Sequence, residues 1–194
     1  MADPTIRELI TKIENNIIQL PVFQRAFVWD GNKVQKFVES LYKGYPTGSF
    51  LMWTVTKKNK EIQFLVDGQQ RLTSLYSVIK KAKVVNADDK ELTIELSFRP
   101  HDEKFEVSNA ATKTNPEYFS DISGLFDNTQ TYKLVKEFIH NLKQHRKVND
   151  EEENHLEQSL TRVAGLLSHD LQVVKLISEI NNTTAADIFV RINS

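Results

Sequence analysis

The stretch FLVDGQQRLTSLYSVIK, residues 64–80, joins an apolar run to a helical pattern through an Asp-Gly step. An apolar run of this kind, bounded by a turn signal, is typical of a buried strand. After the step, apolar residues recur at helical spacing, at positions 72, 75, 76 and 79. The sequence therefore predicts a strand that ends near Asp67, a turn through Gly68, and a helix that begins directly afterwards.

The residues at this junction, Asp-Gly-Gln-Gln-Arg at 67–71, leave two interpretations open. The first backbone N–H groups of a helix lack intrahelical partners, and together with the helix dipole they favour an anion such as phosphate. Arg71 could then hold phosphate oxygens through two hydrogen bonds, and Gln69 and Gln70 could donate amide N–H groups or orient a water. Asp67 could hold a metal. Alternatively, the step is an ordinary turn that Asp67 caps, and the glutamines are solvated.

Helices and strands alternate through the first part of the chain. Asp3 and Pro4 form a helix-start pattern, and apolar residues follow at helical spacing, at positions 6, 9, 10 and 13. A second helix is predicted after Asp30, which is a suitable N-cap. Two strands around a lysine-rich turn predict a hairpin over residues 48–68, and alternating apolar residues predict one half-buried strand over residues 91–98.

The later part of the chain has a different character, which begins after a polar stretch near residue 110. Residues 131–146 and 152–169 both carry helical apolar spacing and are joined by a charged turn, which predicts a helical hairpin. A strand is predicted over residues 171–178 and a capped helix over residues 183–194. We therefore divide the chain into a core over residues 1–110 and a mainly helical extension over residues 111–194, which we expect to be truncated at its C-terminus.

Composition excludes several classes of protein. The 194 residues include 40% hydrophobic and 26% charged residues with a formal net charge of -1, which is typical of a globular protein and gives no bulk positive charge for coating nucleic acid. The absence of cysteine excludes disulfides, thiolate metal sites and cysteine nucleophiles. No apolar run approaches the length of a membrane span, and the N-terminus is no signal peptide, so a cytoplasmic location is expected.

Two further segments could serve phosphate or base binding, and each also has a structural interpretation. Gln24 and Arg25 lie among the aromatic residues at positions 23, 27 and 29, which could stack a base beside a bound phosphate. The alternative is a loop that packs on the core. Gly48 and Ser49 could let a ligand approach the backbone closely, or they could simply form a turn.

The remaining polar candidates are weaker. Arg191 and Asn193 are two residues apart, so they would not share one face of a helix, although both could reach one pocket at a fraying helix end. The five histidines show no metal-ligand spacing, and no metal-ligating residues are predicted.

Four segments resemble, in order and spacing, the N-terminal domain family of GmrSD-type restriction endonucleases. They are LPVFQRAFVW at 20–29, YPTGSFLMW at 45–53, VDGQQRLTSL at 66–75 and IFVRINS at 188–194. The resemblance spans most of the chain, and it implies a fold similar to that of ParB and sulfiredoxin. The expected fold class is therefore α+β, with a small mixed sheet and flanking helices, then a helical hairpin and a final strand-helix segment.

The same resemblance implies a module that binds and hydrolyses a nucleoside triphosphate with Mg²⁺ in a restriction endonuclease of phage defence. The partners implied are DNA and a C-terminal HNH-type nuclease domain or subunit. Catalytic roles are implied for the polar residues of the box, Asp67, Gln69, Gln70 and Arg71. Nucleotide-binding roles are implied for Gly68, Gln24, Arg25, Gly48, Ser49, Thr73, Arg191 and Asn193.

The sequence also departs from the family pattern. Family members often continue past the Arg-x-Asn segment into further helices and an HNH-type nuclease domain, and no His-Asn-His constellation or P-loop motif occurs in these 194 residues. Two alternative functions therefore stay open. One is a ParB-like DNA-binding adaptor without catalysis, in which the box contacts DNA phosphates, and the other is a ParB-like nuclease domain. The type of nucleotide and the oligomeric state are not specified by the sequence.

Overall fold

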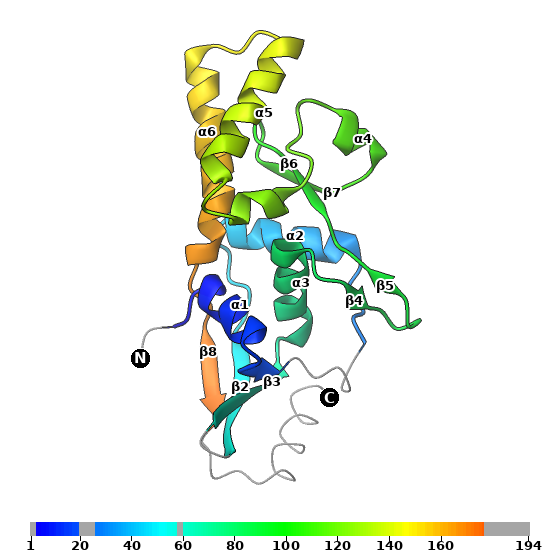
Figure 1. Ribbon diagram of the computed structural model, residues 1–194, viewed down its shortest axis with the longest axis vertical. Helices are drawn as coiled ribbons and strands as arrows, with labels where there is room; N and C mark the ends of the chain where they lie inside the picture. The colour runs from blue at the N-terminus through cyan, green and yellow to red at the C-terminus, as the bar shows by residue number, and fades with distance from the viewer. Residues whose placement is uncertain (1–2, 20–25, 58–59, 177–194) are drawn as a thin grey trace.

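A computed structural model describes residues 3–19, 26–57 and 60–176 of the chain (Figure 1). Its central element is a four-stranded sheet in the order β1 (Ile18–Gln19), β3 (Lys60–Asp67), β2 (Phe50–Lys57) and β8 (Val173–Leu176). β2 and β3 are antiparallel, whereas β1 runs parallel to β3 and β8 runs parallel to β2. The predictions of an α+β fold with a small mixed sheet and of a hairpin over residues 48–68 are confirmed.

One face of this sheet is covered by two helices, α1 (Ile6–Glu14) and α3 (Gln69–Lys80), which lie on the same side of the sheet in Figure 1. Phe50 and Met52 point to this face because side chains alternate along a strand, and both are almost fully buried. α3 follows β3 directly, as predicted, and buries Leu72 and Leu75 on the same side. The hydrophobic core therefore holds the start of α3 at the end of β3.

The N-terminal helix begins later than predicted. Its N-cap is Thr5, whose side chain accepts a hydrogen bond from the backbone N–H of Glu8, while the Glu8 carboxylate accepts one from the backbone N–H of Thr5. The prediction that Asp3 and Pro4 start the helix is wrong, because this reciprocal capping box satisfies two backbone donors at once. Asp3 instead accepts a hydrogen bond from the backbone N–H of Val173, which ties the N-terminal segment to β8.

The second helix, α2 (Gly31–Tyr42), begins where the sequence predicts. Asp30 is its N-cap, and one carboxylate oxygen accepts a hydrogen bond of 2.7 Å from the backbone N–H of Lys33. The helix buries an apolar stripe that begins at Val34 and ends at Tyr42. Gly44 follows with a positive φ of 70°, which suits a residue without a Cβ at the end of a helix.

The single strand predicted over residues 91–98 is wrong. The structure divides it between two small antiparallel sheets, one of β4 (Val84–Val85) with β5 (Glu91–Leu92), the other of β6 (Leu96–Arg99) with β7 (Lys104–Val107). Leu96 and Phe98 of β6 are fully buried and Leu92 of β5 is half-buried, but Ser97 between the two apolar residues of β6 is buried as well. The pattern reports burial on one side, but it cannot report that the two halves pair with different partners.

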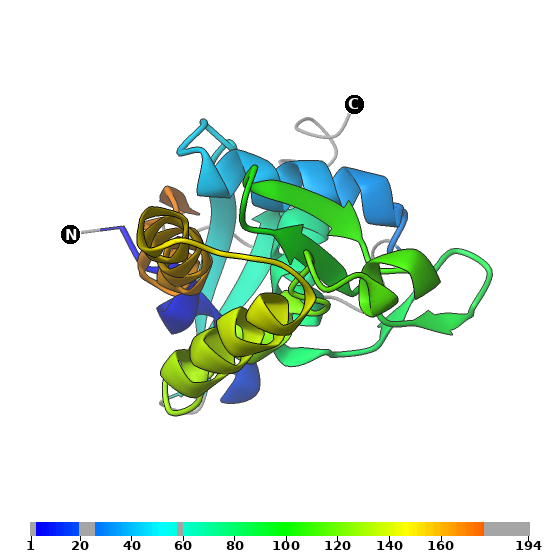
Figure 2. The same cartoon turned by 90° about the horizontal axis from the view of Figure 1, so that it is seen from above.

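The helical hairpin is confirmed. α5 (Thr131–His145) and α6 (Asp150–Gly165) pack against one another through buried aliphatic and aromatic side chains, and Figures 1 and 2 show them side by side. α6 is capped by Asn149, whose side chain accepts a hydrogen bond from the backbone N–H of Glu152. The short helix α4 (Ala110–Thr114) and the 3-10 helices η1 (Ile122–Phe126) and η2 (Leu166–Ser168) complete the described elements.

The chain returns to the central sheet after the hairpin. β8 lies beside β2, with Phe50 opposite Val173 and Met52 opposite Lys175, and so confirms the predicted strand near residues 171–178. The division into 1–110 and 111–194 stays a prediction, and the predicted helix over 183–194 lies outside the described residues. Among the described helices, none has the length and apolar character needed to cross a bilayer.

Candidate functional site

The Asp-Gly-Gln-Gln-Arg box forms the junction between β3 and α3. Gly68 has a φ of +93°, in the left-handed region, and it is the residue that precedes α3. A Cβ at this position would lie 2.5 Å from Cδ1 of Phe50, which is fully buried. As the N-cap residue, Gly68 makes no side-chain cap bond to the first turn of α3. The junction therefore needs a glycine for both its backbone conformation and its packing, and its N-cap residue supplies no side-chain acceptor to the helix N-terminus.

Arg71 holds the loop that precedes β2 against α3. Nη1 donates to the carbonyl oxygen of Thr47 at 2.7 Å, and Nη2 donates to the carbonyl oxygen of Ser49 at 2.9 Å and to Oδ2 of Asp67 at 3.1 Å. The guanidinium carbon lies 4.7 Å from the centre of the Phe50 ring, and the side chain is only 15% exposed. The guanidinium of Arg71 thus joins the backbone of the loop over residues 47–49 and the carboxylate of Asp67 to α3.

Gly48 lies between the two carbonyl groups that Arg71 binds. Its φ is +80°, and a Cβ there would lie 2.7 Å from Nη1 of Arg71. A side chain at this position would therefore displace the guanidinium from Thr47 and Ser49. The Gly48-Ser49 pair, which the sequence offers as a ligand approach or a turn, here shapes the loop that receives Arg71.

Gln70 performs a similar task for the loop over residues 26–28. Its Oε1 accepts a hydrogen bond of 2.9 Å from the backbone N–H of Val28, and its Nε2 donates to the carbonyl oxygen of Ala26 at 3.2 Å. Phe27, between them, donates its backbone N–H to the carbonyl oxygen of Val85 and buries its ring. The side-chain amide of Gln70, in the first turn of α3, therefore accepts one hydrogen bond from the loop backbone and donates one to it, as the backbone of a neighbouring strand would.

This geometry predicts the effect of replacing Gln70 by glutamate. A carboxylate can still accept from Val28, but it cannot donate to Ala26 and would place a negative charge beside that carbonyl oxygen. We expect Gln70→Glu to lower the free energy of unfolding by about 1–2 kcal/mol and to accelerate hydrogen exchange at the Val28 amide. The control is Gln130→Glu at the exposed start of α5, where no side-chain cap bond is made. An unchanged Val28 exchange rate would contradict the role assigned to Gln70.

The other predicted residues are distributed around this junction. Asp67 ends β3, and its side chain is 40% exposed despite its ion pair with Arg71. Gln69 is half-buried at the first position of α3, and Thr73 is half-buried one turn further along. The remaining four predicted residues lie outside the described parts of the chain. They are Gln24, Arg25, Arg191 and Asn193.

Several contacts at the junction were not predicted from the sequence. The groups that Gln70 and Arg71 bind are mostly backbone carbonyl and N–H groups, and no sequence pattern identifies them. Phe50 was predicted only as part of a strand, yet it packs against both Gly68 and Arg71. The available signal was the pair of glycines, Gly48 and Gly68, in segments that meet in space. Both have positive φ values and both would collide with a neighbour if they carried a Cβ.

The sequence of this chain is similar to those of known proteins. The family described as GmrSD restriction endonuclease, N-terminal domain, matches this chain over residues 6–194. The chain is also similar to an uncharacterized protein of Methanocaldococcus jannaschii, at 29% identity, in a segment that covers 37% of this chain and 16% of that protein. The match therefore spans only a small part of the length of that relative.

Proposed function

Because the chain belongs to the GmrSD restriction endonuclease N-terminal domain family, we propose that it is the nucleotide-binding and NTP-hydrolysing module of a DNA restriction endonuclease. In this proposal the core is related to the ParB and sulfiredoxin fold. DNA is the eventual target, and a C-terminal HNH-type nuclease domain or subunit is the partner that cuts it. The module would act in phage defence, where nucleotide turnover is coupled to the action of the nuclease.

The observation that carries this proposal is the open start of α3. The helix begins after a left-handed glycine that makes no side-chain cap bond, and its first turn contains no acidic residue. Backbone N–H groups in that position, together with the helix dipole, favour phosphate oxygens. Asp67 stands one residue before the glycine and is partly exposed. This is a suitable arrangement for a nucleotide phosphate accompanied by a divalent cation.

The residues also fit Mg²⁺, which typically binds nucleotide sites through one or two carboxylates together with the substrate phosphates. Asp67 would hold the ion, which would neutralise charge on the phosphate oxygens. In the described part of the chain no group of three or more His, Asp or Glu side chains gathers as a metal site. A single carboxylate assisted by phosphate oxygens is therefore the arrangement that we propose.

The geometry suggests distinct roles within the box. Gln70 and Arg71 act in this proposal as positioning residues, because their polar groups hold the loops over residues 26–28 and 47–49 beside the helix start. The positive charge of Arg71 also contributes to the field that attracts phosphate. Gln69, at the first position of α3, is assigned the contact to the phosphate or to the attacking water, as a glutamine does in other phosphoryl-transfer sites.

The two loops also offer apolar surface to a ligand. Val28 is 59% exposed and Tyr45 is 58% exposed, although both are large hydrophobic residues. Val28 is held by Gln70, and Tyr45 lies two residues before Thr47, which is held by Arg71. Exposed side chains of this kind on ordered loops suit a nucleobase or the surface of a partner domain. Their positions support a ligand at this end of the sheet.

The test is phosphate release by the full-length protein with each of the four common nucleoside triphosphates and Mg²⁺. We expect turnover of at least one of them, and a loss of roughly 100-fold in Asp67→Asn, because asparagine keeps the acceptor for Arg71 but removes the charge. Asp88→Asn, in the exposed turn after β4, is the matched control. Absence of both binding and turnover in the wild-type protein would exclude the proposal.

The same samples distinguish the alternatives. Salt-dependent DNA binding that requires Arg71 and is indifferent to nucleotide would instead indicate the DNA-binding adaptor. Magnesium-dependent nicking of DNA by residues 1–194 alone would indicate a nuclease domain.

A further inference from the structure

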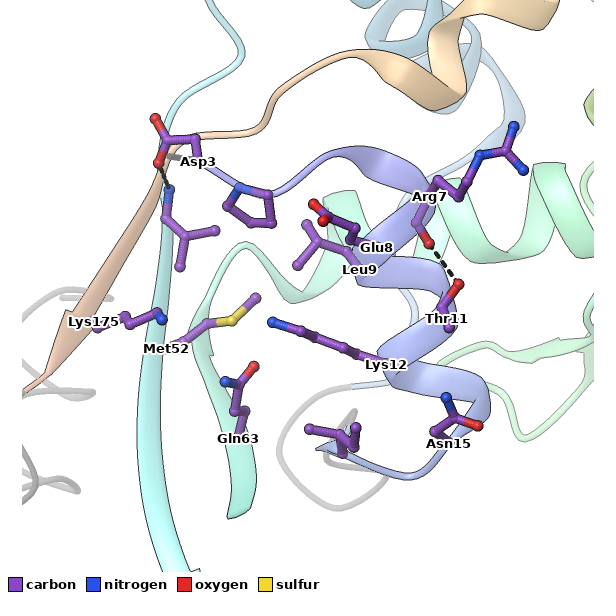
Figure 3. Close-up of a pocket in the computed structure, with 13 residues that line it drawn as sticks. Asp3, Arg7, Glu8, Leu9, Thr11, Lys12, Asn15, Met52, Gln63 and Lys175 are labelled. Atoms are coloured by element: carbon purple, nitrogen blue, oxygen red, sulfur yellow. Dashed lines mark hydrogen bonds between the residues drawn. The ribbon is translucent and has the colours of Figure 1, made fainter. Parts of the chain in front are cut away.

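A cavity lies on the covered face of the central sheet, away from the Asp-Gly-Gln-Gln-Arg box. It has a volume of about 730 Å³, and it is bounded by α1 on one side and by β2, β3 and β8 on the other (Figure 3). Leu9, Ile17, Met52 and Val173 supply its apolar surface. No residue of the box lines it. Its volume is within the range of pockets that bind small organic molecules.

Gln63 is the unusual residue of this cavity. It lies in the middle of β3, opposite Thr54 of β2 and Ile18 of β1, and is only 2% exposed. Its Nε2 donates to Oε1 of Glu61 at 2.6 Å, but among the described residues its Oε1 has no hydrogen-bond partner. Figure 3 shows the amide projecting from β3 toward the end of Lys12. A buried acceptor without a donor is unfavourable, and an aliphatic side chain would fill this position better.

Two ammonium groups reach the same cavity. Lys12 extends from α1 toward Met52 and Gln63, and Lys175 approaches from β8 (Figure 3). Among the described residues neither lysine forms an ion pair. The two carboxylates at the rim keep their charge, but each is held by a backbone N–H group, Glu8 by that of Thr5 and Asp3 by that of Val173. The cavity therefore combines two unpaired cations, an unused acceptor and an apolar wall.

We propose that this cavity binds a small organic anion that has a flat apolar body and an N–H or O–H donor. Lys12 and Lys175 would meet the anionic group, the donor would satisfy Oε1 of Gln63, and the body would lie against Met52 and Val173. Thioether sulfur and aliphatic groups are favourable contacts for an aromatic ring. The site is separate from the proposed nucleotide site, and it does not depend on that assignment.

The experiment uses 8-anilinonaphthalene-1-sulfonate, whose fluorescence reports binding and which carries an aryl body, a sulfonate and one N–H. Its neutral counterpart, N-phenyl-1-naphthylamine, lacks only the sulfonate. For the full chain we expect the sulfonate to bind at least about tenfold more tightly than the neutral probe. The double variant Lys12→Met, Lys175→Met should lose this preference, whereas Lys36→Met on the exposed side of α2 should keep it.

Gln63→Met provides the second readout. Because it removes the unpaired acceptor, we expect a melting temperature a few degrees above that of the wild type without probe, together with several-fold weaker binding of both probes. If this variant does not fold, the proposal is tested by the probe preference of the lysine double variant alone. An unchanged preference in the lysine double variant, or no binding of the sulfonate by the wild-type protein, would overturn the proposal.

Discussion

Gly68→Ala is expected to destabilise the protein by about 3 kcal/mol, from about 1–2 kcal/mol for a left-handed backbone at a residue with a Cβ and a comparable amount for overpacking. The collision is with the ring of Phe50, which is fully buried and cannot move without disturbing the core. For a chain of this size the melting temperature should fall by roughly 10 °C. Thermal and urea unfolding of the purified variant provide the measurement.

Gly44→Ala is the matched control for this substitution. Gly44 also has a positive φ, of 70°, but no atom lies within 4 Å of the Cβ that alanine would add. Its cost should therefore be the conformational part alone, about 1 kcal/mol. The difference between the two variants isolates the packing of Gly68 against Phe50. Equal destabilisation by both would mean that this packing contributes nothing.

Arg71→Lys should have the second large effect, a loss of about 2–3 kcal/mol, because three hydrogen bonds depend on the shape of the guanidinium. A lysine keeps the positive charge near Asp67, but one ammonium group cannot span the carbonyl oxygens of Thr47 and Ser49 in the geometry of a fork. The loop over residues 47–49 should therefore detach from α3 before the protein unfolds globally. Hydrogen exchange at residues 47–49 would report this local opening.

Arg99→Lys is the comparison for that variant. Arg99 also forms a two-pronged contact with an aspartate, Asp102, but both side chains are substantially exposed, and within the described part of the chain Arg99 binds no backbone carbonyl. Exposed ion pairs contribute little, so the expected loss is below about 1 kcal/mol. A similar loss in the two variants would show that Arg71 acts only as a surface charge, and would contradict its role in positioning the loop.

The fold was predictable where the apolar spacing of a helix and the residue at its start indicate the same element that the packing stabilises. The helix that follows Gly68 and the helix capped by Asp30 were both found from apolar spacing and a suitable first residue. The start of α1 was misplaced because Asp3 and Thr5 are both suitable N-cap residues. The structure uses Thr5, which forms a reciprocal capping box with Glu8. The strand over residues 91–98 was misjudged because periodicity reports one buried side and not the partner strand.

The candidate site was predictable in its location but not in its contacts. The sequence identified the box at 67–71 and treated Arg71 and the glutamines as ligand-binding or solvated groups. The structure shows that Gln70 and Arg71 bind backbone groups of two loops that are distant in sequence. Such contacts depend on where loops lie in space, which residue type and spacing do not encode.

Hydrogen exchange at the amides of residues 69–71 tests the proposed nucleotide site most directly. The full-length protein would be measured with Mg²⁺, with and without a saturating nucleoside triphosphate that it binds. We predict slower exchange at these three amides when nucleotide is present, because phosphate oxygens would accept from the open first turn of α3. Nucleotide binding that leaves exchange at residues 69–71 unchanged would contradict the assignment of this helix start as the phosphate site.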